Sequence, residues 1–134
     1  MANNITTYLK TRLIEHLLGK TTFTAPATLY AALYSVRPAV SGSGGTEFSA
    51  GSYARVAITN NTTNFPQTGT GIIINGTSVT FPTATADQGT AVCVVILDAS
   101  TGGNMLLISN VISIAVLDGV ALFFDPGDLT FTLQ

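Results

Sequence analysis

Residues 91–110 read AVCVVIL-DAS-TGGN-MLLISN, which is two apolar runs separated by a turn-forming segment. Each run has the length and the side chains typical of a β-strand, and the Gly102-Gly103 pair favours a tight turn between them. Short apolar runs alternate with turns from residue 28 to the end of the sequence. Other clear turns are Asp118-Gly119 and Asp125-Pro126-Gly127-Asp128.

Eight segments are candidate strands: 28–34, 55–59, 78–81, 91–97, 105–110, 113–116, 120–124 and 129–133. Short strands with frequent turns favour two packed antiparallel layers. The stretches 41–51 and 60–71 are predicted to be loops, and their length marks them as places for binding or assembly contacts. We therefore predict a mainly β protein, with an antiparallel β-sandwich or barrel-like fold of about eight strands.

The N-terminal segment has the periodicity of a helix. Its apolar residues recur every four positions at Ile5, Leu9, Leu13 and Leu17. Asn4 is the expected N-cap, Gly19 is the expected stop, and the helix between them should be amphipathic and about 14 residues long. We expect its apolar face to dock on the sheet of the same chain, with a neighbouring subunit as the alternative. The whole chain, 1–134, is predicted to be one domain, with the helix in 1–19 and a β domain in 20–134.

Charge is sparse and unevenly distributed. Only 9% of the residues are charged, whereas 46% are hydrophobic. All five basic residues lie before position 56: Lys10, Arg12, Lys20, Arg37 and Arg55. With two glutamates, the first 55 residues carry a net charge of +3, and the other 79 carry −5 from aspartates alone. So low a charge density predicts that partners cover much of the surface, and five scattered cations argue against nucleic-acid binding.

The residue types that catalysis requires are scarce. His16 is the only histidine, and Cys93 is the only cysteine and is expected to be a buried thiol within an apolar run. Gly19-Lys20-Thr21 follows a helix, whereas a phosphate-binding loop precedes one. The Asp125–Asp128 segment, with Asp118 nearby, favours plain turns over a calcium site. The sequence therefore predicts no enzyme activity, no metal site and no cofactor.

A glycine-rich segment at residues 42–55, GSGGTEFSAGSYAR, leads directly into a strand. Tyr53 and Arg55 alternate at its end, and both are residue types that anchor protein interfaces. We take Glu47, Phe48, Tyr53 and Arg55 as candidate interface residues. Tyr53 and Arg55 could equally act within the chain.

Several motifs, taken in order and spacing, resemble a family of small structural proteins of tailed bacteriophages that are described as tail-fibre-like or minor virion proteins. The resemblance covers nearly the whole chain. Its motifs are the helix at 8–18, PATLYAALY at 26–34, GTEFSAGSYAR at 45–55, FPTATAD at 81–87, DASTGGN at 98–104 and GDLT at 127–130.

The resemblance implies a non-enzymatic virion structural protein: a tail-fibre or surface-appendage component that forms a homo-oligomer and binds other proteins of the tail or capsid. One alternative is a capsid decoration (cement) protein. Another is a carbohydrate-binding receptor module that binds a host surface glycan through aromatics such as Tyr53 or Phe65. The N-terminus lacks a signal-peptide pattern, and no apolar run is long enough to span a membrane. We expect synthesis in the host cytoplasm and residence in the virion.

Overall fold

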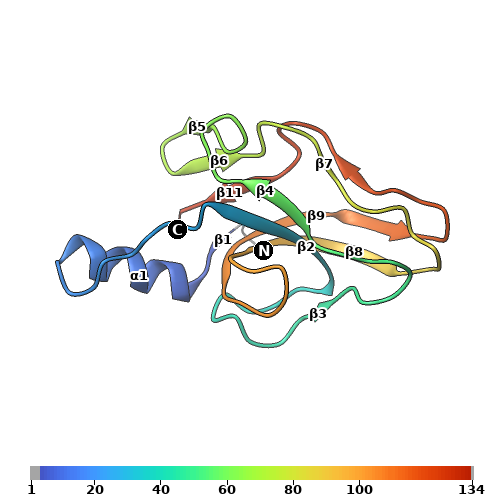
Figure 1. Cartoon of the computed structure of the whole chain (residues 1–134), viewed down its shortest axis with the longest axis horizontal. Coiled ribbons are helices and arrows are strands. Elements are labelled where there is room, and N and C mark those ends of the chain that lie inside the picture. The colour runs from blue at the N-terminus through green and yellow to red at the C-terminus, as the bar shows by residue number, and fades with distance from the viewer. Residues whose placement is uncertain (1–3, 134) are drawn as a thin grey trace.

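The computed structural model describes residues 4–133, which form one helix and eleven strands (Figure 1). In chain order these are β1 (Asn4–Ile5), α1 (Thr7–Leu17), β2 (Thr28–Val36), β3 (Thr46–Glu47), β4 (Val56–Thr59), β5 (Gln67–Gly69), β6 (Ile72–Ile74), β7 (Val79–Thr80), β8 (Gly89–Leu97), β9 (Met105–Val116), β10 (Phe123–Phe124) and β11 (Thr130–Thr132). A mainly β protein with one N-terminal helix is confirmed.

The long antiparallel strands β2, β8 and β9 form the centre of the sheet. β2 pairs with β8 from Tyr30 opposite Leu97 to Tyr34 opposite Cys93. β8 turns through residues 98–104 and pairs with β9. Apolar and β-branched side chains suit a strand that is covered on both faces, and every residue from Cys93 to Ile96 is fully buried. The strand–turn–strand pattern of residues 91–110 is confirmed as the middle of the fold.

The large sheet has the order β3-β2-β8-β9-β1-β11-β6-β5, and β4 also pairs with β2. β1 lies between β9 and β11, antiparallel to β9 and parallel to β11. The other strand pairs of residues 4–133 are antiparallel. The predicted antiparallel arrangement therefore holds, with the β1–β11 pair as its exception.

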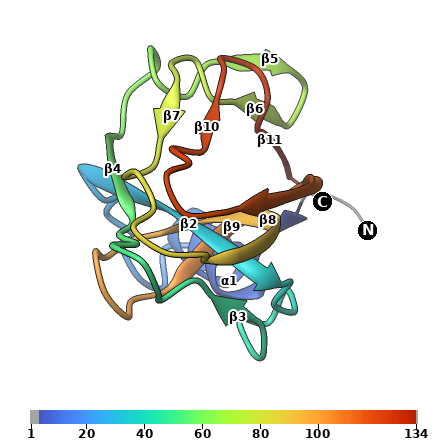
Figure 2. The same cartoon turned by 90° about the vertical axis from the view of Figure 1, so that its right-hand side faces the viewer.

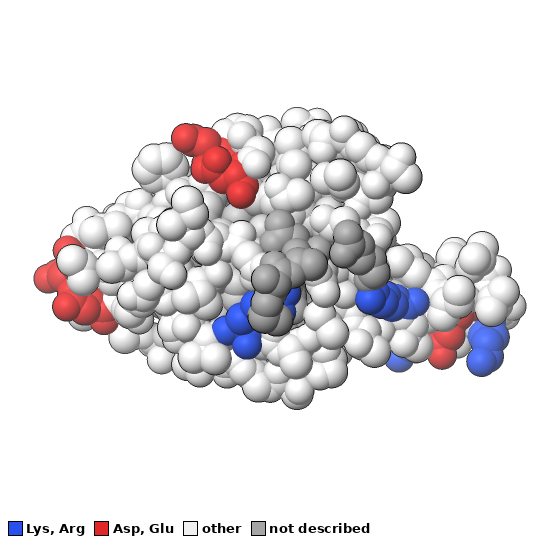
Figure 3. All heavy atoms as spheres, turned by 180° about the vertical axis from the view of Figure 1, so that it is seen from behind, with Lys and Arg blue, Asp and Glu red and all other residues white. Residues whose placement is uncertain are grey.

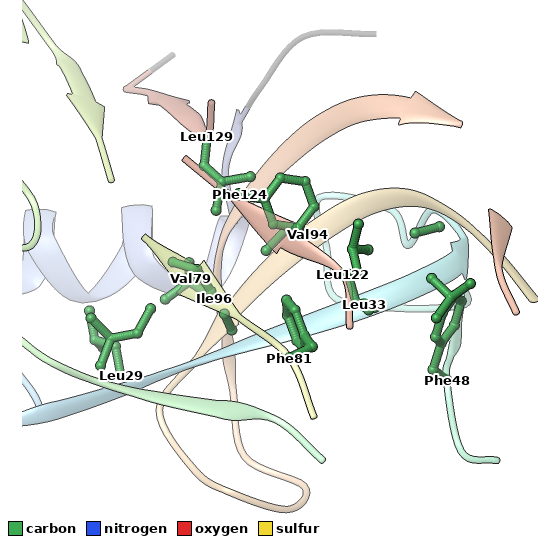
Figure 4. Close-up of a cluster of buried hydrophobic side chains, with 14 of the residues drawn as sticks. Leu29, Leu33, Phe48, Val79, Phe81, Val94, Ile96, Leu122, Phe124 and Leu129 are labelled. Carbon is green, nitrogen blue, oxygen red and sulfur yellow. The ribbon is translucent and has the colours of Figure 1, made fainter. Parts of the chain in front are cut away.

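The sheet curls over a hydrophobic core, and the two-stranded β7–β10 ribbon lies on the other side of that core from β2 and β8 (Figure 2). Leu33 of β2 and Val94 of β8 lie beside Phe81 and Phe124, which come from the opposite layer (Figure 4). The Phe81 and Phe124 rings meet edge to face, with their centroids 6.4 Å apart. Two layers packed on one core confirm the predicted sandwich.

Strand boundaries differ from the prediction where pairing partners, not local sequence, determine them. Segments 105–110 and 113–116 are one continuous strand, β9, and the predicted strand at 120–124 is reduced to β10. The short strands β3 and β5 lie within stretches predicted to be loops. β3 forms because it pairs with the end of β2, and β5 forms because the chain turns back on β6. Strands of two or three residues leave no periodicity that a sequence pattern could reveal.

α1 begins later than the sequence predicts. Asn4, the expected N-cap, and Ile5 belong to β1, where the Ile5 side chain is buried. Thr6 is the N-cap instead: its hydroxyl accepts a hydrogen bond from the Leu9 N–H at 3.4 Å and donates to the Met105 carbonyl at 2.6 Å. Ile5 satisfies the helical spacing but contributes to the sheet, so the helix spans 11 residues and not about 14.

Candidate functional site

Glu47 joins Tyr53 and Arg55 in one hydrogen-bonded cluster beside the end of β2. One carboxylate oxygen, Oε1, accepts from Arg55 Nε at 2.8 Å and from the Tyr53 hydroxyl at 2.9 Å. The other oxygen, Oε2, accepts from Arg55 Nη2 at 2.8 Å. This two-point pairing of guanidinium and carboxylate is the strongest form of a side-chain ion pair. Side chains within the glycine-rich segment at residues 42–55 therefore bind one another.

The electrostatics of the cluster keep each group in one protonation state at neutral pH. Burial alone would raise the pKa of the Glu47 carboxyl, but the hydrogen bonds from Arg55 and Tyr53 and the charge of Arg55 outweigh burial and lower it. The hydrogen bond to Glu47 raises the pKa of the Arg55 guanidinium. Burial raises the pKa of the Tyr53 hydroxyl. Tyr53 therefore remains a donor to an ionised Glu47.

The same side chains connect three separate parts of the chain. Arg55 Nη1 donates to the carbonyls of Ala99 and Gly102, at 2.7 Å and 2.8 Å, in the turn between β8 and β9. The Leu33 N–H of β2 donates to the Tyr53 hydroxyl oxygen at 3.0 Å. The Tyr53 ring packs against Phe48, with centroids 5.9 Å apart. Glu47, Phe48, Tyr53 and Arg55 therefore hold residues 47–55 and the turn on the sheet.

An open hollow of about 390 Å³ lies over this cluster and is lined by the same four residues together with Ala54 and residues 100–102. The Phe48 side chain is buried, and the Arg55 side chain is only 8% exposed. Contacts within the chain are thus established for both residues. The role of the four residues as contacts to another protein stays a prediction.

The remaining candidate residues have local structural roles. Asp128 Oδ2 accepts from the Asp125 N–H at 2.9 Å, which confirms the predicted turn. Asp87 Oδ1 accepts from the Asp118 N–H at 2.9 Å. Cys93 is buried, and burial raises the pKa of its thiol to about 11. Within residues 4–133, no group of three histidine, cysteine, aspartate or glutamate residues is placed to hold a metal ion.

α1 projects from the body of the molecule, and residues 4–133 leave most of its apolar face uncovered (Figure 1). Only its first turns pack on the core, through Tyr8 and Leu9. Four large apolar side chains beyond them are exposed: Leu13, Ile14, Leu17 and Leu18. Leu17, the most exposed of them, is 76% accessible. The prediction that the helix docks on its own sheet is therefore correct only for the first turns of α1.

Two hollows flank the helix. One, of about 380 Å³, lies between α1 and the end of the chain and is lined by Lys10, Leu13, Ile14 and Leu17, together with Ile5 and Leu133. The spacing of Lys10, Leu13, Ile14 and Leu17 places them on a single helix face. Sequence periodicity predicted this apolar face, but spacing alone does not reveal whether the rest of the chain covers it.

The other hollow, of about 360 Å³, lies beside the beginning of α1, between Leu9 and Phe65. Phe23 and Ile73 line it as well, with Asn60 and Asn61 at its polar part. Phe65 was one of the aromatics considered for a sugar site. A sugar needs several polar partners, whereas the walls here are mainly apolar.

Charged residues of opposite sign lie at the two ends of the molecule, with further charged groups between them (Figure 3). The helix end carries Lys10, Arg12 and Lys20 with Glu15, a net charge of +2. At the other end lie the loop that precedes β8 and the loop between β9 and β10 (Figure 1). The acids of these loops are Asp87 and Asp118, which carry a charge of −2. The two ends of the molecule therefore carry opposite net charge, +2 and −2.

Residues 4–132 match a family model described as Podophage GP4 fiber I protein gp80. No curated protein matches the chain. Among the described residues, α1 is too short and too polar to be a membrane-spanning helix.

Proposed function

Because the chain belongs to the family of the podophage GP4 fibre I protein gp80, we propose that it is a non-enzymatic structural subunit of a phage fibre and is present there in several copies. The family supports a virion component with a fibre role. Assembly from repeated copies and the absence of catalysis are the parts that we add.

The observation that carries this proposal is the uncovered apolar face of α1. Leu13, Ile14 and Leu17 expose a continuous apolar strip on a helix that stands away from the core. Removing such a strip from water contributes about 25 cal/mol for each Å² of apolar surface buried, from which the cost of association is subtracted. A virion subunit meets its neighbours at a fixed position, so it can keep a surface of this kind for assembly.

The hydrogen bonds of two carboxylates, Glu47 and Asp98, agree with a structural role. Glu47 is fully engaged by Arg55 and Tyr53, so its carboxylate is occupied by structural hydrogen bonds. Asp98 Oδ1 and Oδ2 accept from Asn104 in the turn between β8 and β9. These carboxylates shape loops, which is the task expected of them in a scaffold protein.

Electron cryo-microscopy of the phage particle tests the proposal. We expect density for this chain in a fibre, in more than one copy, with neighbours against α1. Density over the capsid surface would make it a decoration protein and would contradict the fibre assignment. A single copy per fibre would contradict repeated assembly.

Binding of purified protein to host polysaccharides is the complementary measurement. The proposal expects no saturable binding by the isolated subunit. Binding that Phe65→Ala abolishes would instead show a receptor module at the hollow beside α1.

A further inference from the structure

We propose that copies of this chain associate head to tail, with the α1 face of one copy docked on the acidic end of the next. The helix face consists of Lys10, Leu13, Ile14 and Leu17. The acidic end consists of Asp87, Leu117, Asp118 and Val120. This inference rests on the proposed function, because it specifies the partner as a second copy of the same chain.

The helix face combines an apolar groove with a positive rim. Leu13, Ile14 and Leu17 line the hollow of about 380 Å³ beside Leu133, and Lys10 borders it. Lys10 is exposed and forms no ion pair within residues 4–133. The groove therefore accepts an apolar knob that carries negative charge.

The acidic end has this complementary character. Leu117 and Val120 are exposed apolar residues on either side of Asp118 in the turn between β9 and β10. Among the described residues, neither the Asp87 nor the Asp118 carboxylate forms an ion pair. Each surface thus offers exposed apolar area together with a charge opposite to that of the other surface.

The turn at the acidic end is held in place before any partner arrives. The Gly119 N–H donates to the Ala84 carbonyl at 2.7 Å, and the Ala84 N–H donates to the Val120 carbonyl at 2.8 Å. The Asp118 N–H is bound by Asp87. A preordered turn loses little conformational entropy on docking, which favours association.

Charge decides between two ways of covering the helix face. A symmetric pair of α1 helices would place two helix ends against each other, each with a net charge of +2. Head-to-tail docking places +2 against −2 (Figure 3). Unlike the symmetric pair, it also leaves one free helix face and one free acidic end on every open assembly, so it can repeat along a fibre.

Sedimentation analysis of the full chain over a range of protein concentrations tests the contact. Wild type should form species larger than a dimer, and raising the salt concentration should weaken their association because exposed charges are screened. Leu17→Asp blocks the helix face, and Asp118→Lys blocks the acidic end while keeping the backbone N–H that Asp87 binds. Each should raise the dissociation constant about tenfold or more.

Asp125→Lys is the matched control, because it makes the same change of charge in the separate acidic cluster of the β10–β11 loop. It should associate like wild type. Circular dichroism must show that all three variants are folded. Equal weakening by Asp125→Lys would overturn the proposal, because the effect would then follow net charge and not the docking surface.

Mixing the two blocked variants identifies the geometry. Leu17→Asp keeps its acidic end and Asp118→Lys keeps its helix face, so head-to-tail docking predicts a 1:1 complex of the two and nothing larger. A symmetric helix pair predicts that Asp118→Lys associates alone and that mixing adds nothing, which would overturn the proposal.

The remaining outcomes separate this contact from the fibre role. Association that neither variant weakens would overturn the head-to-tail contact and leave repeated assembly intact. A wild-type chain that stays monomeric at the highest concentrations would also overturn the contact. Absence of the chain from fibre density in the phage particle would instead overturn the proposed function, whatever the sedimentation result.

Discussion

Asn75 is a buried amide that connects β6 to the turn between β10 and β11. Its Nδ2 donates to the carbonyls of Thr77 and Asp125, at 3.1 Å and 2.8 Å. Its Oδ1 accepts from the N–H groups of Gly127 and Leu129, at 3.1 Å and 2.8 Å. An asparagine side chain can do no more, since it has two donor hydrogens and one acceptor oxygen with two lone pairs.

We expect Asn75→Ala to lower the free energy of unfolding by about 2–4 kcal/mol, because it removes four hydrogen bonds and leaves the buried Leu129 N–H without its partner. Urea denaturation followed by circular dichroism measures the loss. Asn61→Ala is the control, since Asn61 is exposed and makes a local hydrogen bond to the Asn64 N–H. Its cost should stay below about 1 kcal/mol. Equal stability of the Asn75 variant and wild type would show that these hydrogen bonds contribute nothing net.

Glu47 makes stability depend on pH. The Glu47 carboxyl has a lower pKa in the folded protein than in the unfolded chain. Its contribution to the free energy of unfolding is therefore fully present above the pKa of the unfolded chain, and it is lost as the pH falls through the pKa of the folded protein. We therefore measure the free energy of unfolding by urea denaturation at neutral pH and at a pH below about 4. Between these two conditions, wild type should lose more stability than Glu47→Gln. Glu15→Gln is the control that removes a carboxylate outside the cluster, in the ion pair with Arg12 on α1. Identical losses in wild type and Glu47→Gln would contradict the lowered pKa.

The turn between β8 and β9 depends on two adjacent glycines for different reasons. Both have positive φ, +60° at Gly102 and +76° at Gly103. A Cβ on Gly102 would meet open space, whereas one on Gly103 would lie 2.5 Å from Asp98 Oδ1 and 2.7 Å from Ala99 Cβ. The first position tolerates a side chain at the cost of backbone strain alone. The second also requires the turn to shift.

We expect Gly102→Ala to cost about 1 kcal/mol and Gly103→Ala at least about 1 kcal/mol more in unfolding free energy. Thermal or urea denaturation of the two variants, each with the same added methyl group, isolates the steric contribution. Because Arg55 binds the carbonyls of Ala99 and Gly102, a shifted turn should also weaken the Glu47 cluster. Equal costs at the two positions would show that the turn adjusts freely.

The two halves of α1 should respond differently to substitution. Leu9 packs against the core, whereas Leu17 is exposed. At concentrations where the chain is monomeric, Leu9→Ala should cost about 1–2 kcal/mol in unfolding free energy, and Leu17→Ala should stay within about 0.5 kcal/mol. A large cost at Leu17 in the monomer would mean that the end of the helix packs on its own chain.

Sequence patterns predict an element well when its own residues determine it. β8 and the turn after it were found because a long apolar run and a Gly-Gly pair are local signals. β3 and the entry of Ile5 into the sheet were missed, because each depends on a pairing partner elsewhere in the chain. β5 was missed because it pairs with the next strand, β6, over too few residues to leave a pattern. Ile5 does fit the helical periodicity of the segment, but its backbone pairs with β9 and so belongs to the sheet.

At the scale of the whole molecule, the sequence predicted residue types better than it predicted their surroundings. It selected Tyr53 and Arg55 as prominent residues, but their bonds to Glu47, Leu33 and the β8–β9 turn come from tertiary contacts. It also showed that basic and acidic residues are separated along the chain. Only the fold reveals that this separation gives two oppositely charged ends, because distant loops meet at the acidic end.

The N-terminal strand β1 joins two parts of the large sheet. Asn4 pairs with Ile108 of β9 on one side and with Thr132 of β11 on the other. The Ile5 side chain is buried, and the Thr6 hydroxyl donates to the carbonyls of Met105 and Leu106. The helix therefore cannot be removed by cutting from the N-terminus without also removing the strand between β9 and β11. Point substitutions are the sound way to test the helix face.

A chain that lacks residues 1–6 should lose more than about 3 kcal/mol of unfolding free energy, because it forfeits the burial of Ile5 and the Thr6 hydrogen bonds. Hydrogen exchange should show faster exchange of the β11 amides in particular, since β11 loses its parallel neighbour. A chain that lacks only residues 1–3 retains β1 and is the control for shortening the N-terminus. If both shortened chains unfold at the wild-type urea concentration, β9 and β11 are held together by the core alone and β1 is dispensable.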